Sequence, residues 1–255
     1  MKRFWKDVSV EPEGDTWRIG LDGRPVKTPA RALLAVPTRA LAEAIADEWR
    51  SVEGEIDPRA MPLTGLANAA IDRVAPDRLA FAQSLARYAE ADLTCYRAEG
   101  PQPLIDRQQQ HWDALLGWAR RRFDVDFATT SGLIHVAQPK ATVERLAHAV
   151  AALETFRLAG LSPLVTIGGS LIAGFAVAEE PITAEQAWDA VTLDERWQAE
   201  QWGADAEAEQ ALENRRRDFF AAARFVELLS SDGPPTLGRS STGTAGARGG
   251  AARRR

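Results

Sequence analysis

The side chains of this sequence that could do chemistry are few and scattered. The histidines His111, His135 and His148 do not have the spacing of metal ligands. Cys95 is the single cysteine, which excludes a disulfide within the chain and a metal site built from cysteines. No histidine is near it in the sequence to activate it as a nucleophile, and we interpret it as a small buried side chain.

Glycine-rich motifs that bind phosphate are also missing from the sequence. Ile167–Ser170 is rich in glycine, but it lies in an apolar stretch and lacks the lysine of a P-loop. Ser170 is not in a nucleophile elbow, because Ile172 occupies the last glycine position of that motif. We therefore expect no cofactor, no metal and no catalysis. The alternative is a hydrolase or transferase in which carboxylates such as Glu195 and Asp92 converge in a cleft.

Leu158–Ala178 carries no charge, although 26% of the residues in the chain are charged. Its length matches the ~20 residues that span a bilayer. Four glycines and Ser162–Pro163 argue against a span, since a helix that starts at this pair has only about fifteen residues left. We predict one central helix, buried on all sides, and no membrane insertion. A structural subunit of a membrane-associated complex is the alternative.

A recognition surface is predicted in the segment that follows. Thr183 is expected to cap a helix that ends at Gly203. A seven-residue spacing would place a carboxylate and an amide on one face with two tryptophans. The residues of this stripe are Trp188, Val191, Glu195, Gln198 and Trp202. The carboxylate of Glu195 on such a face either forms an ion pair within the protein, extends into solvent, or is available to a binding partner.

The first part of the chain is predicted to be a small α/β module. Phe4–Val10 and Asp15–Leu21 flank turn residues, which is typical of an antiparallel hairpin, and Arg24–Thr28 and Ala32–Val36 add short strands. Thr38 then caps a helix. The apolar stripe of that helix consists of Leu41, Ile45, Trp49 and Val52.

The remaining sequence has mainly helical periodicity, with one short extended piece at 129–136. The predicted helical segments are Leu79–Asp92, Leu104–Phe123, Pro139–Leu158 and Asp205–Leu229. The fold class is therefore α+β, an antiparallel N-terminal module followed by a larger all-helical domain. We expect an α/β module at 1–75, a helical domain at 76–229 and a disordered basic tail at 230–255.

Charge and composition narrow the class of partner. The chain is 45% hydrophobic, as in a globular protein, and its net charge is −5. The tail has five arginines and one aspartate, so it carries +4 and leaves −9 on the body. An acidic body does not favour nucleic acid or anionic membranes. The N-terminus has no apolar signal region, so we expect a cytoplasmic, bacterial protein. Eight tryptophans without catalytic groups indicate a protein-binding function.

Several ordered segments resemble the ATP-twelve chaperones, which assist assembly of the catalytic head of the F-type ATP synthase. Ala114 stands where that family's pattern has proline, and the basic tail is not part of the pattern. The matching segments are Leu21–Arg24, Lys27–Pro29, Ala42–Trp49, Met61–Thr64, Asp92–Leu93, Cys95–Ala98, Gln109–Asp113, Gly169–Leu171, Ala187–Trp188, Asp194–Gln198 and Trp202–Gly203.

This resemblance implies a two-domain chaperone without enzyme activity. It implies binding to the unassembled alpha subunit of the synthase, over the surface that the beta subunit later covers. The family's important acidic position falls on Glu195 or Asp194, and its important tryptophan on Trp49. We expect Glu195, Asp194, Trp188, Gln198 and Trp202 to bind the partner, and Trp49, Asp92, Tyr96, Arg97 and Gly169 to be structural. No pattern in the sequence specifies an oligomeric state.

Overall fold

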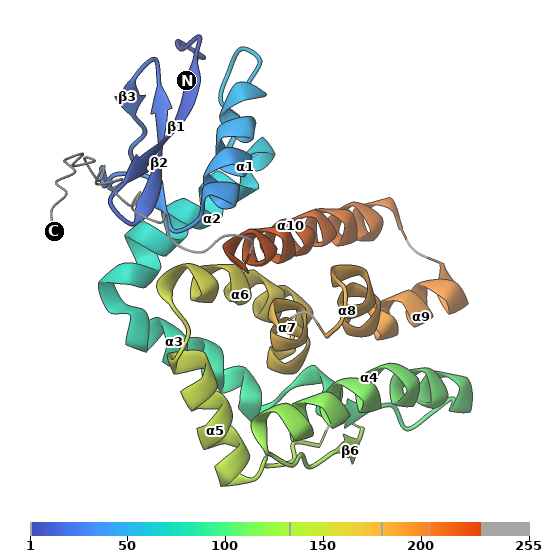
Figure 1. Cartoon of the computed structure of the whole chain (residues 1–255). Helices are drawn as coiled ribbons and strands as arrows, with labels where there is room; N and C mark the ends of the chain where they lie inside the picture. The colour runs from blue at the N-terminus through green and yellow to red at the C-terminus, as the bar shows by residue number, and fades with distance from the viewer. Residues whose placement is uncertain (1, 133, 180, 204, 231–255) are drawn as a thin grey trace, which may run out of the picture.

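An antiparallel sheet opens the computed structural model, which describes residues 2–132, 134–179, 181–203 and 205–230 (Figure 1). β1 (Val8–Glu13) pairs with β2 (Thr16–Leu21), with Val8 opposite Leu21 and Glu13 opposite Thr16. The predicted hairpin is confirmed, but its first strand begins at Val8 instead of Phe4 and extends through Pro12 and Glu13, which were predicted to lie in the turn. The loop has two residues, and the first of them, Gly14, has a φ of +59°. β3 (Arg24–Pro25) and β4 (Ala35–Val36) both pair with β2.

α1 (Arg39–Arg50) packs against this sheet, and the predicted cap at Thr38 is confirmed. The Thr38 Oγ1 atom accepts a hydrogen bond from the Leu41 amide at 3.2 Å. On the predicted stripe Leu41, Ile45 and Val52 are buried, whereas Trp49 is half-buried. The indole of Trp49 contacts the buried Trp5 edge to face, with ring centroids 5.2 Å apart.

Glu48 of α1 fixes the start of α2 (Pro62–Ala69). Its carboxylate accepts hydrogen bonds from the amides of Leu63 (2.7 Å) and Thr64 (2.8 Å) and from the Thr64 hydroxyl (2.6 Å). Met61 precedes α2, and its side chain makes no hydrogen bond that could cap the helix. Burial raises the pKa of Glu48, and the three hydrogen bonds oppose that shift. A side chain of one helix thus satisfies the free amides of the next.

The rest of the described chain is mainly helical, as predicted, with short helical turns and a two-stranded parallel sheet between the long helices. Those elements are η1 (Pro58–Ala60), η2 (Ala70–Val74), η3 (Ala75–Asp77), α3 (Arg78–Ala86), η4 (Arg87–Glu90), η5 (Leu93–Cys95), β5 (Tyr96–Arg97), α4 (Gln102–Phe123), β6 (Thr130–Ser131) and α5 (Lys140–Ala151).

The apolar stretch forms two helices, so the prediction of one helix was wrong. α6 (Thr155–Gly168) ends where Gly169 turns the chain with a φ of +65°, and α7 (Leu171–Ala178) then packs against α6. Pro163 lies inside α6 and is not a helix start. The predicted burial on all sides is confirmed for α7, where nearly every residue is inaccessible. It is wrong for α6, in which Thr166 is exposed and Pro163 and Ile167 are only half-buried. No helix in the described part of the chain is long and apolar enough to cross a membrane.

The predicted helix from Thr183 to Gly203 is also two helices, α8 (Ala184–Val191) and α9 (Leu193–Trp202). Thr183 caps α8 in a capping box with Gln186, as expected of this residue. The interruption at Thr192 breaks the predicted stripe. Trp188 is 6% exposed and packs on Phe219, whereas Trp202 is 79% exposed.

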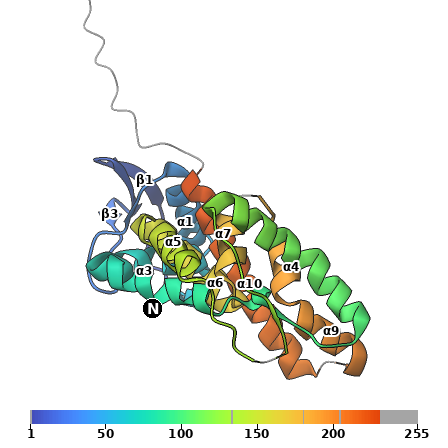
Figure 2. The same ribbon diagram turned by 90° about the horizontal axis from the view of Figure 1, so that it is seen from below.

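α10 (Ala206–Ser230) packs against α1 and α2, near the sheet, and also against α6, α7 and α8 (Figures 1 and 2). Phe219 lies near its middle and belongs to a cluster with Trp188. Phe225 and Leu228, near its end, pack into the core beneath the N-terminal sheet. The Thr38 hydroxyl donates to the Leu228 carbonyl at 2.8 Å, which fixes this end of α10 to the start of α1. The predicted disordered tail starts at Ser230, which is instead the last residue of α10, and residues 231–255 lie outside the described residues.

Trp49→Arg should destabilise the N-terminal module. The substitution removes the edge-to-face contact with Trp5 and brings a guanidinium against a buried indole. We expect a loss of about 2–4 kcal/mol, since Trp49 is only partly buried and the longer arginine side chain can reach water. The melting temperature should fall by about 5–15 °C.

Trp49→Phe is the control, because it keeps an aromatic ring against Trp5 and should lower the melting temperature much less. A folded Trp49→Arg variant with the melting temperature of the unmodified protein would contradict a structural role and assign Trp49 to an interface.

Candidate functional site

Three of the predicted recognition residues line one hollow between α9 and α10. Glu195, Gln198 and Trp202 follow each other at spacings of three and four, so they share one face of α9. The hollow has a volume of about 500 Å³. Its other lining residues are Ala199, Gly203, Asp205, Ala208, Glu209, Ala211, Leu212 and Arg215. Trp188 is absent from this hollow, because it lies on α8 and packs inward.

Glu195 forms an ion pair with Arg215 across the hollow. The two terminal guanidinium nitrogens of Arg215 donate to the two carboxylate oxygens of Glu195, and the Nη1–Oε1 distance is 3.0 Å. The side chains of Glu195 and Arg215 remain 51% and 41% exposed. Because solvent screens such a pair, it contributes about 0–1 kcal/mol to folding. The carboxylate is therefore internally paired, yet still accessible to a partner.

Asp194 faces a direction about 100° away from Glu195 on α9, toward α4. Its Oδ1 atom accepts a hydrogen bond from Gln108 Nε2 of α4 at 2.8 Å. Gln108 is 1% exposed, and its Oε1 atom accepts from the Ala98 amide at 2.8 Å. Removing either side chain would leave buried polar atoms without partners. Asp194 thus fixes α9 to α4 and does not line the hollow with Glu195.

Arg97 holds the other end of this polar network. Its Nη1 atom donates to the Gln108 carbonyl at 3.0 Å and its Nη2 atom to Asp113 at 2.6 Å. The guanidinium lies 5.3 Å from the ring centroid of Trp112, whose indole donates to the Ala190 carbonyl at 2.8 Å. Arg97 is well placed to hold β5 against α4. Its neighbour Tyr96 makes a 3.0 Å hydrogen bond to His135.

Asp92 is almost fully buried and joins η5 to the start of α7. Its Oδ1 atom accepts from the amide and hydroxyl of Thr94 and from the Ser170 hydroxyl, and its Oδ2 atom accepts from the Ile172 amide. These four distances lie between 2.7 and 3.0 Å. The Leu93 amide donates to the Gly169 carbonyl at 3.0 Å. Burial raises the pKa of Asp92, while the hydrogen bonds favour its charged form.

The carboxylates of the enzymatic alternative do not share a cleft. The oxygens of Asp92 are occupied by Thr94, Ser170 and Ile172, whereas Glu195 pairs with Arg215 on the surface. In the described part of the chain no three histidine, cysteine or acidic side chains group as metal ligands would. The arrangement suits packing and surface recognition.

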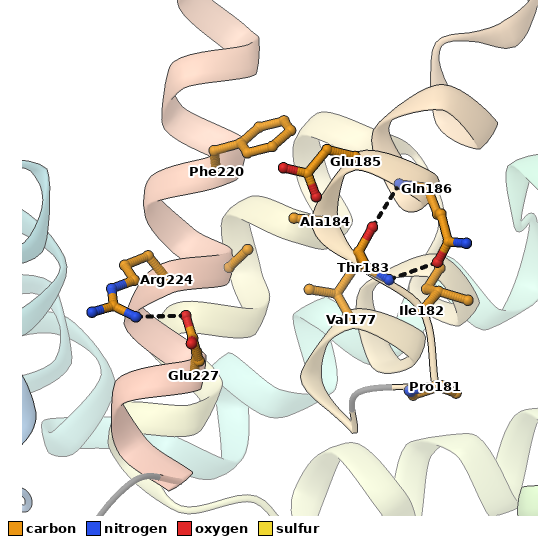
Figure 3. A pocket seen from close by; sticks show the side chains of 11 residues that line it. Val177, Pro181, Ile182, Thr183, Ala184, Glu185, Gln186, Phe220, Arg224 and Glu227 are labelled. Carbon is orange, nitrogen blue, oxygen red and sulfur yellow. Dashed lines mark hydrogen bonds and ion pairs between the residues drawn. The ribbon is translucent and has the colours of Figure 1, made fainter.

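Figure 3 shows a larger hollow, of about 550 Å³, between the start of α8 and α10. Four of its polar side chains have partners within the chain, namely Thr183, Gln186, Arg224 and Glu227. Thr183 and Gln186 form the capping box of α8, and Arg224 donates to Glu227 at 2.8 Å. Phe220 and Ile182 supply apolar surface. None of the predicted recognition residues lines this hollow.

The sequence did not identify Arg215 or Gln108 as site residues. Each is separated from its acidic partner by 20 or more positions, so only the fold brings the pairs together. The run Arg215–Arg217 on a predicted helix was a usable signal, because an isolated basic cluster on an acidic body is expected to pair with nearby acids.

Comparison with known proteins finds one family and several relatives. A family model described as ATP12 chaperone protein matches residues 2–120. The solved structure of Atp12 from Paracoccus denitrificans is 42% identical, with a TM-score of 0.86, over 89% of this chain and 97% of that one. A solved protein of Agrobacterium tumefaciens is 38% identical, with a TM-score of 0.85, over 90% and 86%. The mitochondrial protein atp12 of Schizosaccharomyces pombe is 25% identical over 89% of this chain and 83% of that protein.

Asp92→Ala should destabilise the whole helical part. The substitution leaves buried donors of Thr94, Ser170 and Ile172 without an acceptor, and we expect a loss of about 3–5 kcal/mol. The melting temperature should fall by about 6–15 °C. Asp15→Ala removes an exposed carboxylate and is the matched control, with an expected change below about 0.5 kcal/mol. Equal melting temperatures for the two variants would show that Asp92 is not a structural anchor.

Cys95 should resist alkylation in the folded protein. The side chain is fully buried, and burial raises the pKa of its thiol to about 12, so little thiolate is present near neutral pH. Iodoacetamide should leave the native protein unmodified by mass spectrometry, and it should add one group after unfolding in guanidinium chloride. Rapid modification of the native protein would contradict the buried, unreactive assignment.

Proposed function

The chain belongs to the ATP12 chaperone family, which acts in assembly of the F1 part of ATP synthase, and we propose that it binds the unassembled alpha subunit. We propose further that it shields the alpha-subunit surface that the beta subunit covers after assembly. Members of this family are chaperones, not enzymes, and membership therefore excludes the hydrolase or transferase alternative.

One observation carries the proposed binding site: Trp202 is 79% exposed at the edge of a hollow that also contains an accessible ion pair. Tryptophan and arginine dominate the energetics of protein interfaces, and exposed apolar surface rimmed by polar residues marks an interaction site. Leu212 and Ala208 add apolar lining on the α10 side. We assign this surface, which we call the α9–α10 hollow, to the alpha subunit.

The Glu195–Arg215 pair gives the hollow charge specificity as well as apolar area. In the free chaperone each charge satisfies the other. A basic group of the alpha subunit can approach Glu195 from solvent, and an acidic group can approach Arg215, because both side chains are half-exposed. Covering the apolar surface of an unassembled subunit in this way would prevent its aggregation until the beta subunit replaces the chaperone.

We also propose a bacterial cytoplasmic location. Two solved relatives are from bacteria and share 42% and 38% identity with this chain. The body of the protein is acidic, which does not favour association with anionic membranes.

Glu195→Lys and Trp202→Ala should weaken alpha-subunit binding while the fold stays intact. The ion pair is exposed and contributes about 1 kcal/mol or less, so the melting temperature should move by no more than a few degrees. In the complex the charge of Glu195 would be removed from water, so its interaction energy with a partner is larger there. We therefore expect a loss of about 2–5 kcal/mol in the free energy of binding. Calorimetry and thermal unfolding on the same samples measure both effects. Glu144→Lys, in an exposed pair on α5, is the control.

A charge swap separates an internal role of Glu195 from a role in binding. Glu195→Arg combined with Arg215→Glu restores the ion pair with reversed orientation. Stability should return, but alpha-subunit affinity should stay low, since the client then meets the wrong charge at each position. Recovery of affinity in the swapped variant would assign Glu195 to structure alone. Failure of the unmodified protein to hold the alpha subunit in solution would overturn the proposed function.

A further inference from the structure

A second hollow, of about 430 Å³, lies between α4 and α8. It shares Pro181, Ile182 and Gln186 with the hollow of Figure 3 but opens toward α4, which runs beneath α7, α8 and α9 in Figure 1. Its apolar surface comes from three helices. The buried residues of its lining are Leu115, Ala176 and Ala190, and the half-buried ones are Trp118 and Ile182. Concave apolar surface between helices, with a few polar groups at the rim, is typical of ligand sites.

The rim of this α4–α8 hollow carries positive charge. Arg121 lines it, and among the residues that the structure describes this arginine forms no ion pair. Its neighbours are occupied, Arg120 by Asp126 at 2.9 Å and Arg122 by Glu179. The acidic residue in the lining, Asp189, is bound by Arg196. A carboxylate that enters the hollow would thus meet an available guanidinium, which binds carboxylates in two-point geometry.

The shape of the surroundings favours a linear segment of protein over a small molecule. At His111 and Asp189 the α4–α8 hollow adjoins a smaller one, of about 120 Å³, that Arg107 and Glu200 line. From Arg107 to Trp118 α4 advances by ~16 Å, at 1.5 Å per residue. An extended chain of about five residues covers that length.

We propose that the α4–α8 hollow binds a short extended segment of the client, in which a bulky apolar side chain fills the pocket and an adjacent aspartate or glutamate pairs with Arg121. The inference rests on the proposed function, since the client is the alpha subunit. It adds a second contact on elements different from those of the α9–α10 hollow. Two contacts on one client multiply their affinities, so each can be weak alone and release can proceed stepwise.

Small probes test the chemistry of the hollow without the client. 4-Phenylbutyrate has an aromatic ring and a carboxylate, and 4-phenylbutylamine has the same ring with the opposite charge. The carboxylate probe should shift the indole N–H resonance of Trp118 saturably in NMR spectra, which Trp118→Phe assigns. The amine should bind at least about tenfold more weakly, and Arg121→Gln should remove this difference. Equal binding of both probes, or no saturable shift, would overturn the proposed ligand chemistry.

Client binding tests the site in the full protein. Arg121→Glu reverses the rim charge, and Ala114→Phe fills the hollow from an exposed position of α4. Each should weaken alpha-subunit affinity at least about fivefold, with an unchanged melting temperature. Arg87→Glu and Ala80→Phe make the same changes at exposed positions outside the hollow and should have no effect.

The two proposals fail in different ways. If Trp202→Ala weakens client binding but Arg121→Glu and Ala114→Phe do not, the inference about the α4–α8 hollow is wrong and the proposed function stands. If the unmodified chaperone does not bind the alpha subunit, the proposed function is wrong. The proposal that the α4–α8 hollow binds a segment of this client is then also wrong, even if the carboxylate probe binds.

Discussion

The close contact of α6, α7 and α10 is the constraint on which the positions of the other helices depend. A Cβ atom at Gly160 would lie 2.6 Å from Val226 of α10, and one at Gly174 would lie 2.7 Å from Val165 of α6. These glycines let three helices approach closely, at distances that any larger side chain would prevent. The chain reverses between α6 and α7 at Gly169, whose positive φ suits glycine, and Asp92 holds the start of α7. α10 extends from this contact into the N-terminal core.

Local signals of the sequence predicted local structure well. Thr38 and Thr183 precede their helices with a side-chain oxygen in range of free amides, and both caps form. Ser162–Pro163 has the pattern of a helix start but lies inside α6, because burial of α6 against α10 outweighs the hydrogen bond that proline cannot make. The break at Thr192 was missed, although Thr192 with Glu195 three residues later is a typical helix-start pattern. Its hydroxyl instead donates to the Trp188 carbonyl at 2.7 Å.

The sequence predicted only some residues of the α9–α10 hollow, because the others are brought there by contacts between helices. The spacing of Glu195, Gln198 and Trp202 correctly predicted a shared face, because these three lie within one helix. Trp188 was assigned to that face on the assumption of an unbroken helix, and the turn at Thr192 rotates it into a cluster with Phe219. Arg215 completes the pair from another helix, and no spacing rule relates positions on different helices.

The roles of Asp194 and Glu195 differ because adjacent residues on a helix face directions about 100° apart. Asp194 bonds to the buried Gln108 and holds α9 on α4, whereas Glu195 remains half-exposed beside Trp202. The contact of Asp194 with Gln108 fixes the position of Glu195, so the proposed recognition face of α9 is held in place before a partner arrives. Such preorganisation lowers the entropic cost of binding. A substitution at Asp194 would therefore reduce affinity through the fold, and one at Glu195 through the contact itself.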